Sequence, residues 1–389
     1  MMKTHILIVS LLFMALMINA AEGASDMNRR SFALLRMLHD DAQGKNVVIS
    51  YYSIAQAMGM TELGAKGQTA QELRDYLGLS PKREFFLEWN KTFEKYNKIK
   101  LLTANRIWIQ ADETVRPDFT ASLKRYFASG VDYADFAKDS DNVKVQINAF
   151  VSKSTQKMIQ ELLDSRYVFG RDTMLFLVNA IYFKADWETA FDAKATHEGL
   201  FKYQDGTSQK VNFMHGSGMM DYLENKRLGY SAVAIPYKQQ GLFYIALLPD
   251  EATTIDELSG RLAGHGISNL FKSGFTKERV DLEMPRLLIH SFYSLVPAFK
   301  KLGLEKPFAP DADFSGIADG VFISEILHAA TFEMNEKGSS AAAATSVKMT
   351  RGVSIAKKFH ADKPFIGLIY DKTSDVILFS MVVNNPALR

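Results

Sequence analysis

Apolar residues repeat at helical spacing through the first third of the chain. A helix is predicted over 67–79, where Thr69 and Glu72 have the spacing of a capping box and the leucines that follow share one face. The segments 117–127 and 142–163 have the same amphipathic pattern. The first part of the chain is therefore expected to be mainly helical.

From Met174 onward the pattern changes to that of strands. The segment 174–183 is apolar nearly throughout, as in a strand that is covered on both faces. Asp205 and Gly206 form the dipeptide that favours a tight hairpin turn. Further strand-like runs occupy 230–237, 242–249, 280–287 and 375–383.

No Pro/Gly/Ser-rich linker, repeat or low-complexity tract separates the helical part from the strand-rich part. Dividing the chain between them would leave each part with half a core. We therefore predict a single α+β domain whose sheets combine segments that are distant in the sequence.

Composition narrows the function classes. The chain has 389 residues, 47% of them hydrophobic, which is enough for a large core. Lys and Arg number 46 against 44 Asp and Glu, so charge gives no reason to expect nucleic acid or a membrane as partner. Cysteine is absent, which excludes disulfides, thiol catalysis and Cys-ligated zinc.

The N-terminal segment has the features of a secretory signal. Lys3 precedes an apolar run over 6–18, and the small residues Ala20, Ala21, Gly23 and Ala24 follow it. The run is shorter than the roughly 20 residues that a membrane span needs, although an uncleaved anchor is the alternative. We expect a signal peptide over 1–23, cleaved between about 20 and 24, and a secreted, extracellular domain over 24–389 with Asn90 as its N-glycosylation acceptor.

The sequence has no motif of a known catalytic site. It lacks G-x-S-x-G, G-x-x-x-x-G-K-[ST] and G-x-G-x-x-G, and His197-Glu198 lacks the second histidine of H-E-x-x-H. The glycines and lysine of 63–69 have the wrong spacing for a phosphate loop, and a helix N-terminus explains them better. Eight histidines are scattered without metal-ligand spacing. We predict no catalytic residue, cofactor or metal.

The run "GSSAAAAT", Gly338 to Thr345, has no apolar periodicity and precedes the bulkier "VKMTRG". A flexible linker is one interpretation, but the residues that follow are strand-like and apolar and belong to the core. The other is a loop that must at times enter a sheet between two existing strands. Each bulky side chain forced into such a gap costs about 1 to 3 kcal/mol, so small residues suit it, and glycine provides a hinge.

These features together resemble the serpin family of serine protease inhibitors. The resemblance runs in order through "NVVISYYSIAQAMGMTELGAKGQTAQEL", "NAIYFKADWETAF", "AVAIPY", "ALLPDE", "ADFSGI", "ILHAATFEMNEKG", "AAAAT" and "DKPF", and covers essentially the whole mature chain. It implies the serpin fold, with helices packed around three β-sheets and an exposed reactive-centre loop at about 337–357.

The resemblance implies a suicide inhibitor, most consistent with a trypsin-like target. A protease cuts the loop and forms an acyl-enzyme, and the hinge then inserts into the central sheet and distorts the trapped protease. The hinge would comprise Glu336, Gly338, Ser339, Ser340, Ala341, Ala342, Ala343, Ala344 and Thr345.

The cleaved bond in the family lies about sixteen residues after the glutamate of the hinge, which gives Gly352-Val353. One residue earlier, Arg351-Gly352 offers a guanidinium to an acidic specificity pocket and is the preferred prediction. A bond at Met349 or elsewhere is the remaining alternative.

Other residues correspond to the family's machinery for opening the sheet. Trp187 falls where the loop begins to enter, and Arg286 is placed to pair with Glu336. Without the resemblance, each would be interpreted as an ordinary core or rim residue. A hydrogen-bonded cluster beneath the sheet would comprise Ser50, Ser53, Asn179 and His328.

The chain departs from the family pattern at Tyr51 in place of proline, Ala185 in place of glycine and Ala329 in place of lysine, and "FSMVVNNP" lacks the usual Gly-Arg pair. None of these departures touches the hinge. They bear on efficiency and stability more than on mechanism.

The rival function is a non-inhibitory carrier, chaperone or storage serpin. Such members carry bulky, charged or proline residues in the hinge, and the run from Gly338 to Thr345 has none. A monomer that forms a covalent acyl complex with a serine protease is expected.

A glycosaminoglycan partner has only weak support. The prediction depends on a cluster of basic residues: Lys91, Lys95, Lys98 and Lys100. Acidic neighbours such as Glu88 and Glu94 favour a solvated helix face instead.

Overall fold

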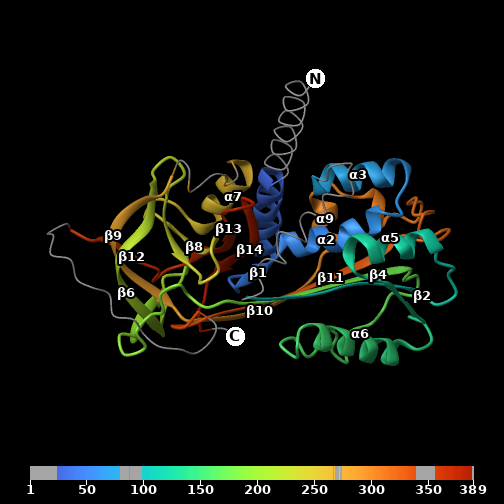
Figure 1. Ribbon diagram of the computed structural model, residues 1–389, viewed down its shortest axis with the longest axis horizontal. Coiled ribbons are helices and arrows are strands. Elements are labelled where there is room, and N and C mark those ends of the chain that lie inside the picture. The colour runs from blue at the N-terminus through green and yellow to red at the C-terminus, as the bar shows by residue number, and fades with distance from the viewer. Residues whose placement is uncertain are drawn as a thin grey trace, which may run out of the picture.

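The computed structural model describes residues 24–78, 87, 99–265, 267, 271, 274–338 and 355–387. In these parts of the chain the strands form two hydrogen-bonded sheets, flanked by helices (Figure 1). The helices are 24–41, α2 (Tyr51–Glu62), α3 (Gly67–Leu77), α5 (Pro117–Phe127), α6 (Ser140–Ser154), α7 (Ile255–His265), α9 (Val296–Lys301) and the 3-10 turn η1 (Lys306–Phe308).

The five-stranded sheet combines parallel and antiparallel strand pairs. Its order is β10 (Leu287–Ser294), β11 (Ile323–Met334), β4 (Leu175–Lys184), β2 (Lys100–Gln110) and β3 (Val131–Ala134). β11 and β4 are parallel neighbours, whereas β11 pairs antiparallel with β10, and β4 antiparallel with β2. The middle of the sheet is thus a parallel pair between antiparallel ones.

The other sheet has nine strands. Its order is β1 (Val47–Ile49), β14 (Val376–Val383), β13 (Phe365–Asp371), β8 (Leu242–Pro249), β7 (Tyr230–Pro236), β6 (Ser208–Asn225), β9 (Thr276–Pro285) and β12 (Lys357–His360), with β5 (His197–Lys202) also on β6. β1 pairs with β14 from the other end of the chain, so the prediction of sheets built from distant segments is confirmed.

The resemblance implied three β-sheets, whereas the strands in the described part of the chain are hydrogen-bonded into two. The long strand β6 explains this. It pairs with β7 through 221–225 and with β9 through 213–222, so one continuous strand joins what would otherwise be two sheets.

Several predicted elements are confirmed. Helix α5 covers 117–127 with Pro117 in its first turn, and β4 is buried along nearly its whole length. The hairpin between β5 and β6 turns at Gly206, whose φ is +83°. The structure also has strands within the other predicted runs.

The prediction that one helix covers 142–163 is wrong. α6 ends at Ser154, because Gln156 and Lys157 adopt positive φ angles of 52° and 65°, which a right-handed helix cannot accommodate. The Thr155 hydroxyl accepts a hydrogen bond from the Ile159 amide in the turn that follows.

The capping box at Thr69 and Glu72 is also wrong. Helix α3 begins after Lys66 without a side-chain cap. The Thr69 hydroxyl instead accepts the Asp313 amide at 2.9 Å, and Glu72 accepts the Lys306 amide at 2.9 Å. These two side chains bind α3 to a distant segment.

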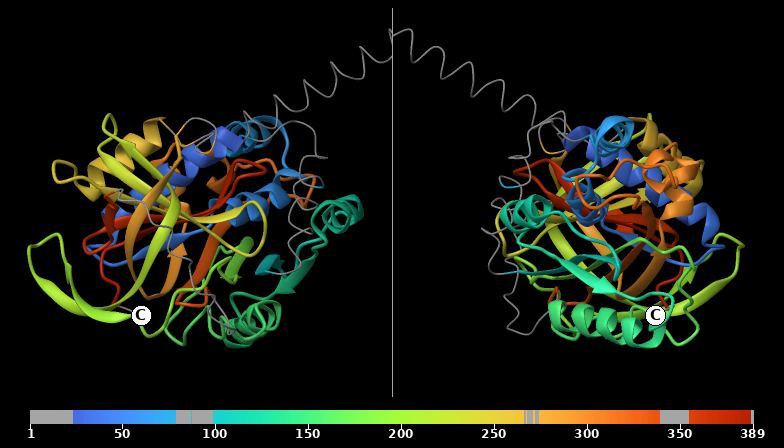
Figure 2. Two further views of the ribbon diagram at one scale, coloured as in Figure 1. Left: turned by 60° about the vertical axis from the view of Figure 1, so that its left-hand side comes forward. Right: turned by 90° about the vertical axis from the view of Figure 1, so that its right-hand side faces the viewer.

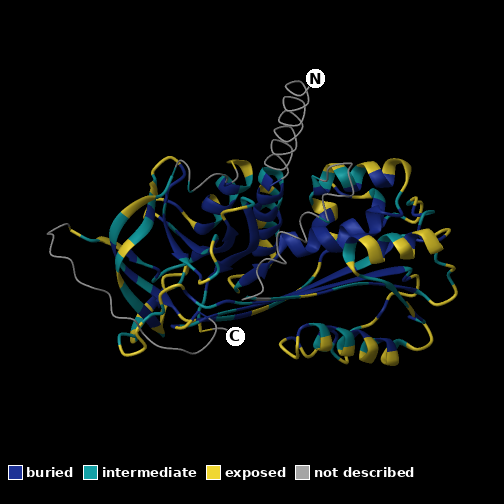
Figure 3. Cartoon of the chain, viewed as in Figure 1, coloured by how far each residue is buried: buried dark blue, intermediate teal, exposed yellow. Residues whose placement is uncertain are grey.

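The five-stranded sheet lies between two helical layers. α6 covers one face, and α2 lies on the opposite side, as Figure 1 and the right-hand view of Figure 2 show. Apolar residues of α6 (Val143, Ile147, Val151) pack in one cluster with residues of β2, β4 and β11. The outer side of α6 is exposed, whereas the strands beneath it are buried (Figure 3).

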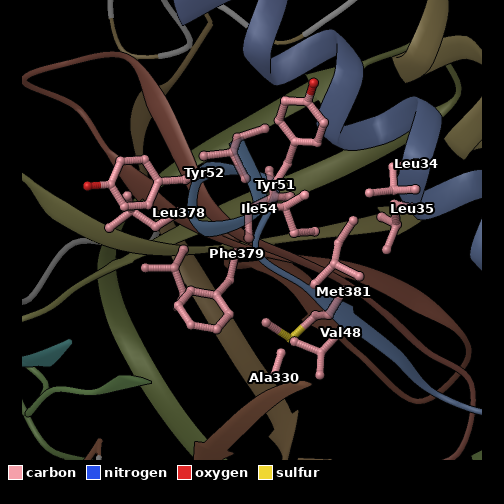
Figure 4. Close-up of a cluster of buried hydrophobic side chains, with 14 of the residues drawn as sticks. Leu34, Leu35, Val48, Tyr51, Tyr52, Ile54, Ala330, Leu378, Phe379 and Met381 are labelled. Carbon is pink, nitrogen blue, oxygen red and sulfur yellow. The ribbon is translucent and has the colours of Figure 1, made fainter. Parts of the chain in front are cut away.

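The larger core lies on the other side of the sheet. Leu34 and Leu35 from helix 24–41, Ile54 from α2 and Phe379 from β14 belong to this cluster (Figure 4). Among the described residues, no helix is both long and apolar enough to cross a bilayer.

Candidate functional site

A row of polar side chains crosses the middle of the five-stranded sheet. Asn105 on β2 is opposite Asn179 on β4, and Asn179 is opposite His328 on β11. Asn179 and His328 are both fully buried. The His328 Nδ1 is hydrogen-bonded to Asn179 Oδ1, so this contact joins the two strands of the parallel pair.

Helix α2 supplies the rest of this cluster. The Ser50 hydroxyl caps the helix by accepting the Ser53 amide at 3.1 Å. The Asn179 amide nitrogen donates to Ser53 Oγ at 2.6 Å and to Asn105 Oδ1. We call Ser50, Ser53, Asn105, Asn179 and His328 the central polar cluster.

The hydrogen bonds define the protonation state of His328. The Ser50 amide donates to Nε2 at 3.2 Å, so Nε2 carries no proton and Nδ1 is the N–H that donates to Asn179. Burial lowers the pKa of His328 to about 3. The side chain is therefore neutral at physiological pH, as this geometry requires.

The sequence identified four members of this cluster and missed Asn105. The available signal was a single asparagine in the strand-like run "LLTANRIWIQ". Its partner on β4 becomes evident only from the register of β2 and β4.

At the Met334 end of β11 the chain turns back immediately. Asn335 and Gly338 form a bridge, with reciprocal hydrogen bonds of 3.3 and 3.0 Å. Gly338 has a φ of +90°, and a Cβ there would lie 2.5 Å from the Ala185 carbonyl oxygen and the Trp187 amide nitrogen. Only glycine fits this position against the end of β4.

Trp187 fixes this turn from the side of β4. Its indole N–H donates to the Asn335 carbonyl at 2.9 Å, and its amide donates to the Lys337 carbonyl at 3.2 Å. The ring is 1% exposed and stacks on Tyr237, with ring centroids 4.4 Å apart. The tryptophan therefore lies where the chain leaves β11.

Glu336 is held at the same turn by two donors. Arg286 Nε donates to its Oε1 at 2.7 Å, and the Thr196 hydroxyl donates to the same oxygen at 2.5 Å. Burial raises the pKa of Glu336, but the hydrogen bonds from Arg286 and then Thr196 outweigh it, so the net shift is downward. The predicted ion pair is present, whereas no sequence signal indicated Thr196.

A pocket of about 890 Å³ lies beside this turn. Its lining includes Arg286, Glu336 and Lys337, together with residues from the loop after Trp187 and from β6. The chain that leaves β11 is thus bordered by open space on one side and by the end of β4 on the other.

The departures from the family pattern lie in or beside buried positions. Tyr51, at the start of α2, is fully buried in the larger core (Figure 4), and burial raises its pKa well above the usual range. Ala329 is 6% exposed and packs beneath α6, where a lysine would bury its charge. Ala185 lies directly against Gly338.

Other predicted residues lie outside the described part of the chain. They are the signal segment 1–23, Asn90, the hinge from Ser339 to Thr345, and the reactive bond at Arg351, Gly352 and Val353.

Within the described ranges, one group of side chains has spacing suited to a metal ion: His39, Asp40 and Asp256. The Asn384 amide nitrogen lies 2.8 Å from His39 Nε2 and donates to it. The ring proton is then on Nδ1, which lies 3.0 Å from Asp256 Oδ1. A protonated Nδ1 cannot be a metal ligand, so we interpret this group as a structural contact.

Comparison with known proteins defines the class to which this protein belongs. The family model of serpins, serine protease inhibitors, matches residues 25–386. The chain is 32% identical to Iris of Ixodes ricinus, covering 86% of this chain and 90% of Iris, and 30% identical to human Serpin B8, covering 92% and 97%.

Solved structures agree. Serpin48 of the insect Tenebrio molitor superposes with a TM-score of 0.83 at 25% identity, covering 94% of this chain and 98% of that one. Thyroxine-binding globulin in complex with thyroxine superposes with a TM-score of 0.80 at 25% identity, covering 94% and 99%. The chain belongs to the serpin family. That family includes protease inhibitors as well as carriers such as thyroxine-binding globulin.

Proposed function

We propose that this protein is a secreted suicide inhibitor of serine proteases. A target protease cuts the segment between Gly338 and Ile355 and forms an acyl-enzyme. The hinge then inserts between β4 and β11, carries the protease with it and distorts its active site. The proposed mechanism needs no cofactor, because the protein acts as a substrate whose cleavage releases stored free energy.

The parallel pairing of β4 and β11 is the observation that supports this proposal. β11 leads into the turn at Glu336 and Gly338, where the chain reverses beside the end of β4. A strand that continued from Gly338 between β4 and β11 would run antiparallel to both. One parallel ladder would be replaced by two antiparallel ladders, which are slightly more stable per residue.

The free energy of such an insertion is large. A dozen new ladder hydrogen bonds at about 1 kcal/mol net each amount to on the order of ten kcal/mol. Insertion must first break the Asn179–His328 hydrogen bond, which joins the two strands. The small residues from Ser339 to Thr345 support the proposal, since they fit a packed gap at little steric cost.

For the reactive bond we propose Arg351-Gly352, with Gly352-Val353 as the alternative. A guanidinium pairs with the buried carboxylate of a trypsin-like specificity pocket, a charge-assisted contact worth roughly 1.5 to 3 kcal/mol. Mass spectrometry of the C-terminal fragment released on trapping distinguishes the two. A fragment that begins at Gly352 supports the trypsin-like target, and one that begins at Val353 contradicts it.

Secretion is the remaining part of the proposal. It rests on the signal-like segment 1–23, and Asn90 is the proposed glycosylation site. Expression in eukaryotic cells tests both: the protein should reach the medium with a new N-terminus between about residues 20 and 24. Glycosidase should shift its mobility by one chain, and Asn90→Gln should abolish that shift.

The central experiment is incubation with a panel of trypsin-like proteases, followed by denaturing electrophoresis. We expect an SDS-resistant complex with at least one of them. Ser339→Arg should convert the inhibitor into a substrate, because burying an unpaired charge slows insertion below deacylation. Ser339→Ala is the matched control and should still form the complex.

Thyroxine-binding globulin makes the carrier function the rival. Clean cleavage of the loop by every protease tested, without any complex, would favour a carrier and overturn the inhibitor proposal.

A further inference from the structure

The strand that follows the reactive loop is short and lies at the edge of the nine-stranded sheet. β12 has four residues and, among the strands of the described residues, pairs only with β9, in parallel register from Lys357 opposite Val280 to His360 opposite Glu283. Phe359 is buried, and the Ala361 amide donates to the Glu283 carbonyl at 2.9 Å. The far end of the loop is attached to the fold through this strand.

His360 connects β12 to two carboxylates of β9. Its Nε2 lies 3.0 Å from Asp281 Oδ2, and its Nδ1 lies 3.3 Å from Glu283 Oε2. The His360 side chain is 17% exposed. We call His360, Asp281 and Glu283 the His360 clamp.

The neighbouring strands extend this row. His215 on β6 places Nε2 2.9 Å from Asp281 Oδ1, and His197 on β5 places Nε2 3.4 Å from Glu283 Oε1. On β12 itself, Lys358 is opposite Asp281 in the register. In the described part of the chain, two carboxylates, two further imidazoles and one lysine thus share this row with His360.

The two contacts of His360 cannot both be satisfied by a neutral ring. Ionised carboxylates only accept hydrogen bonds, and a neutral imidazole has a single N–H, whereas an imidazolium has two. A neutral His360 would leave one ring lone pair facing a carboxylate oxygen. The protonated ring presents a donor and a positive charge to both.

We propose that the His360 clamp is a proton-controlled attachment, which holds β12 against β9 more tightly at mildly acidic than at alkaline pH. Histidine is the side chain whose charge ordinarily changes nearest to neutral pH. Hydrogen bonding from His215, with a further contribution from His360, lowers the pKa of Asp281, and this carboxylate stays ionised as the imidazoles gain protons.

The attachment controls what an uncut loop can do. A strand that inserts from Gly338 moves away from the Met334 end of β11. β12 lies near that end, because Pro285 at the end of β9 leads through Arg286 into β10, and Leu287 of β10 pairs with Met334. An intact loop can insert fully only if β12 leaves β9. Resting on the proposed function, this means that the clamp prolongs the active form more at acidic than at alkaline pH.

Hydrogen exchange of the full-length protein, followed by mass spectrometry of peptides covering 355–362, tests the clamp without any protease. After correction for intrinsic exchange rates, we expect the amide protection of β12 to be about fivefold higher at about pH 5.5 than at about pH 8. A change of this size is typical of the gain or loss of such ion pairs. His360→Gln should remove most of this rise. Glu283→Gln should reduce it while leaving the histidine in place.

His265→Gln is the matched control, because His265 lies on α7 and contacts only the Arg261 carbonyl among the hydrogen bonds of the described residues. The His265→Gln variant should keep the full rise in β12 protection on acidification. An equal rise in wild type and His360→Gln overturns the proposal, as does a wild type without any rise.

A second measurement separates this proposal from the inhibitory function. The half-life of complex-forming activity is measured at both pH values in wild type and in His360→Gln. The ratio of the wild-type half-life to the variant's should rise on acidification, because the effect of His328 is common to both. If no protease is trapped, the exchange experiment still shows whether the attachment of β12 depends on pH through His360. If trapping occurs but β12 protection is independent of pH, the clamp alone is wrong.

Discussion

The centres of the two sheets are equally buried but are held together differently. In the nine-stranded sheet, β13 and β14 are antiparallel, every residue of both is buried, and their side chains are mostly apolar. In the five-stranded sheet, β4 and β11 are parallel, and buried Asn179 and His328 are bonded across them. Burial therefore does not distinguish the two sheets. Strand direction and polar contacts do.

Cleaving the loop between Thr345 and Val353 should produce the largest effect. Only the five-stranded sheet can gain a strand, and on the order of ten kcal/mol of added ladder should raise the melting temperature by about ten degrees or more. A thermal scan before and after limited proteolysis measures this. Hydrogen exchange should slow in β4 and β11 and stay level in β13 and β14. A nicked protein that melts no higher would contradict loop insertion.

Truncating one buried leucine in each sheet should sharpen the contrast. Leu378→Ala in β14 and Leu327→Ala in β11 both remove fully buried side chains and should each cost about 2 to 5 kcal/mol of stability. Only Leu327→Ala should also speed the opening of β4 from β11, because Leu327 packs in the cluster beneath α6. Denaturant unfolding gives the first quantity, and the stoichiometry of inhibition gives the second. Equal changes in stoichiometry would remove the distinction.

Acidification should weaken the five-stranded sheet through His328. The pKa of His328 is about 3 in the fold and about 6.5 in the unfolded chain, so between these values the unfolded chain binds a proton that the fold excludes. Stability should fall by roughly 1.4 kcal/mol per pH unit below about pH 6. Denaturant midpoints from about pH 7 to pH 4 measure the slope. His328→Gln should flatten it, and an unchanged slope would refute the assignment.

The smallest effect should come from the turn after β11. Glu336→Gln keeps the shape but removes the charge paired with Arg286, which is 46% exposed. We expect a loss of about 1 kcal/mol of stability. The loss should affect the Met334 end of β11 and leave β13 and β14 unchanged. A double-mutant cycle with Arg286→Gln isolates the pair. Additive effects would mean that the two side chains do not interact in solution.

Local patterns predicted the elements whose stability depends on local sequence. α5 matches its amphipathic segment, and β4 matches its apolar run, because helix start signals and burial on both faces are written in consecutive residues. The Thr69–Glu72 capping box was wrong since both side chains bond to a segment more than 200 residues away. Neighbouring sequence cannot reveal such partners.

The candidate site shows the same limit. The resemblance to serpins implied a cluster with Asn179 and His328 and a pair between Arg286 and Glu336, and the structure has hydrogen bonds at both places. Asn105 joins the polar row only through the register of β2 with β4. Thr196 reaches Glu336 from a loop 140 residues earlier in the chain.

Helix α6 has a consequence for timing. Its apolar face rests on β2, β4 and β11 together, so an additional strand would push β4 and β11 apart by about 4.8 Å beneath it. The helix must lose its contacts with one side and repack before the sheet can close again. Tighter packing of α6 would extend the shelf life of the native protein, yet it would also give the acyl-enzyme more time to hydrolyse and escape. On the proposed mechanism, the residues beneath α6, among them the small Ala329, therefore balance durability against speed of capture.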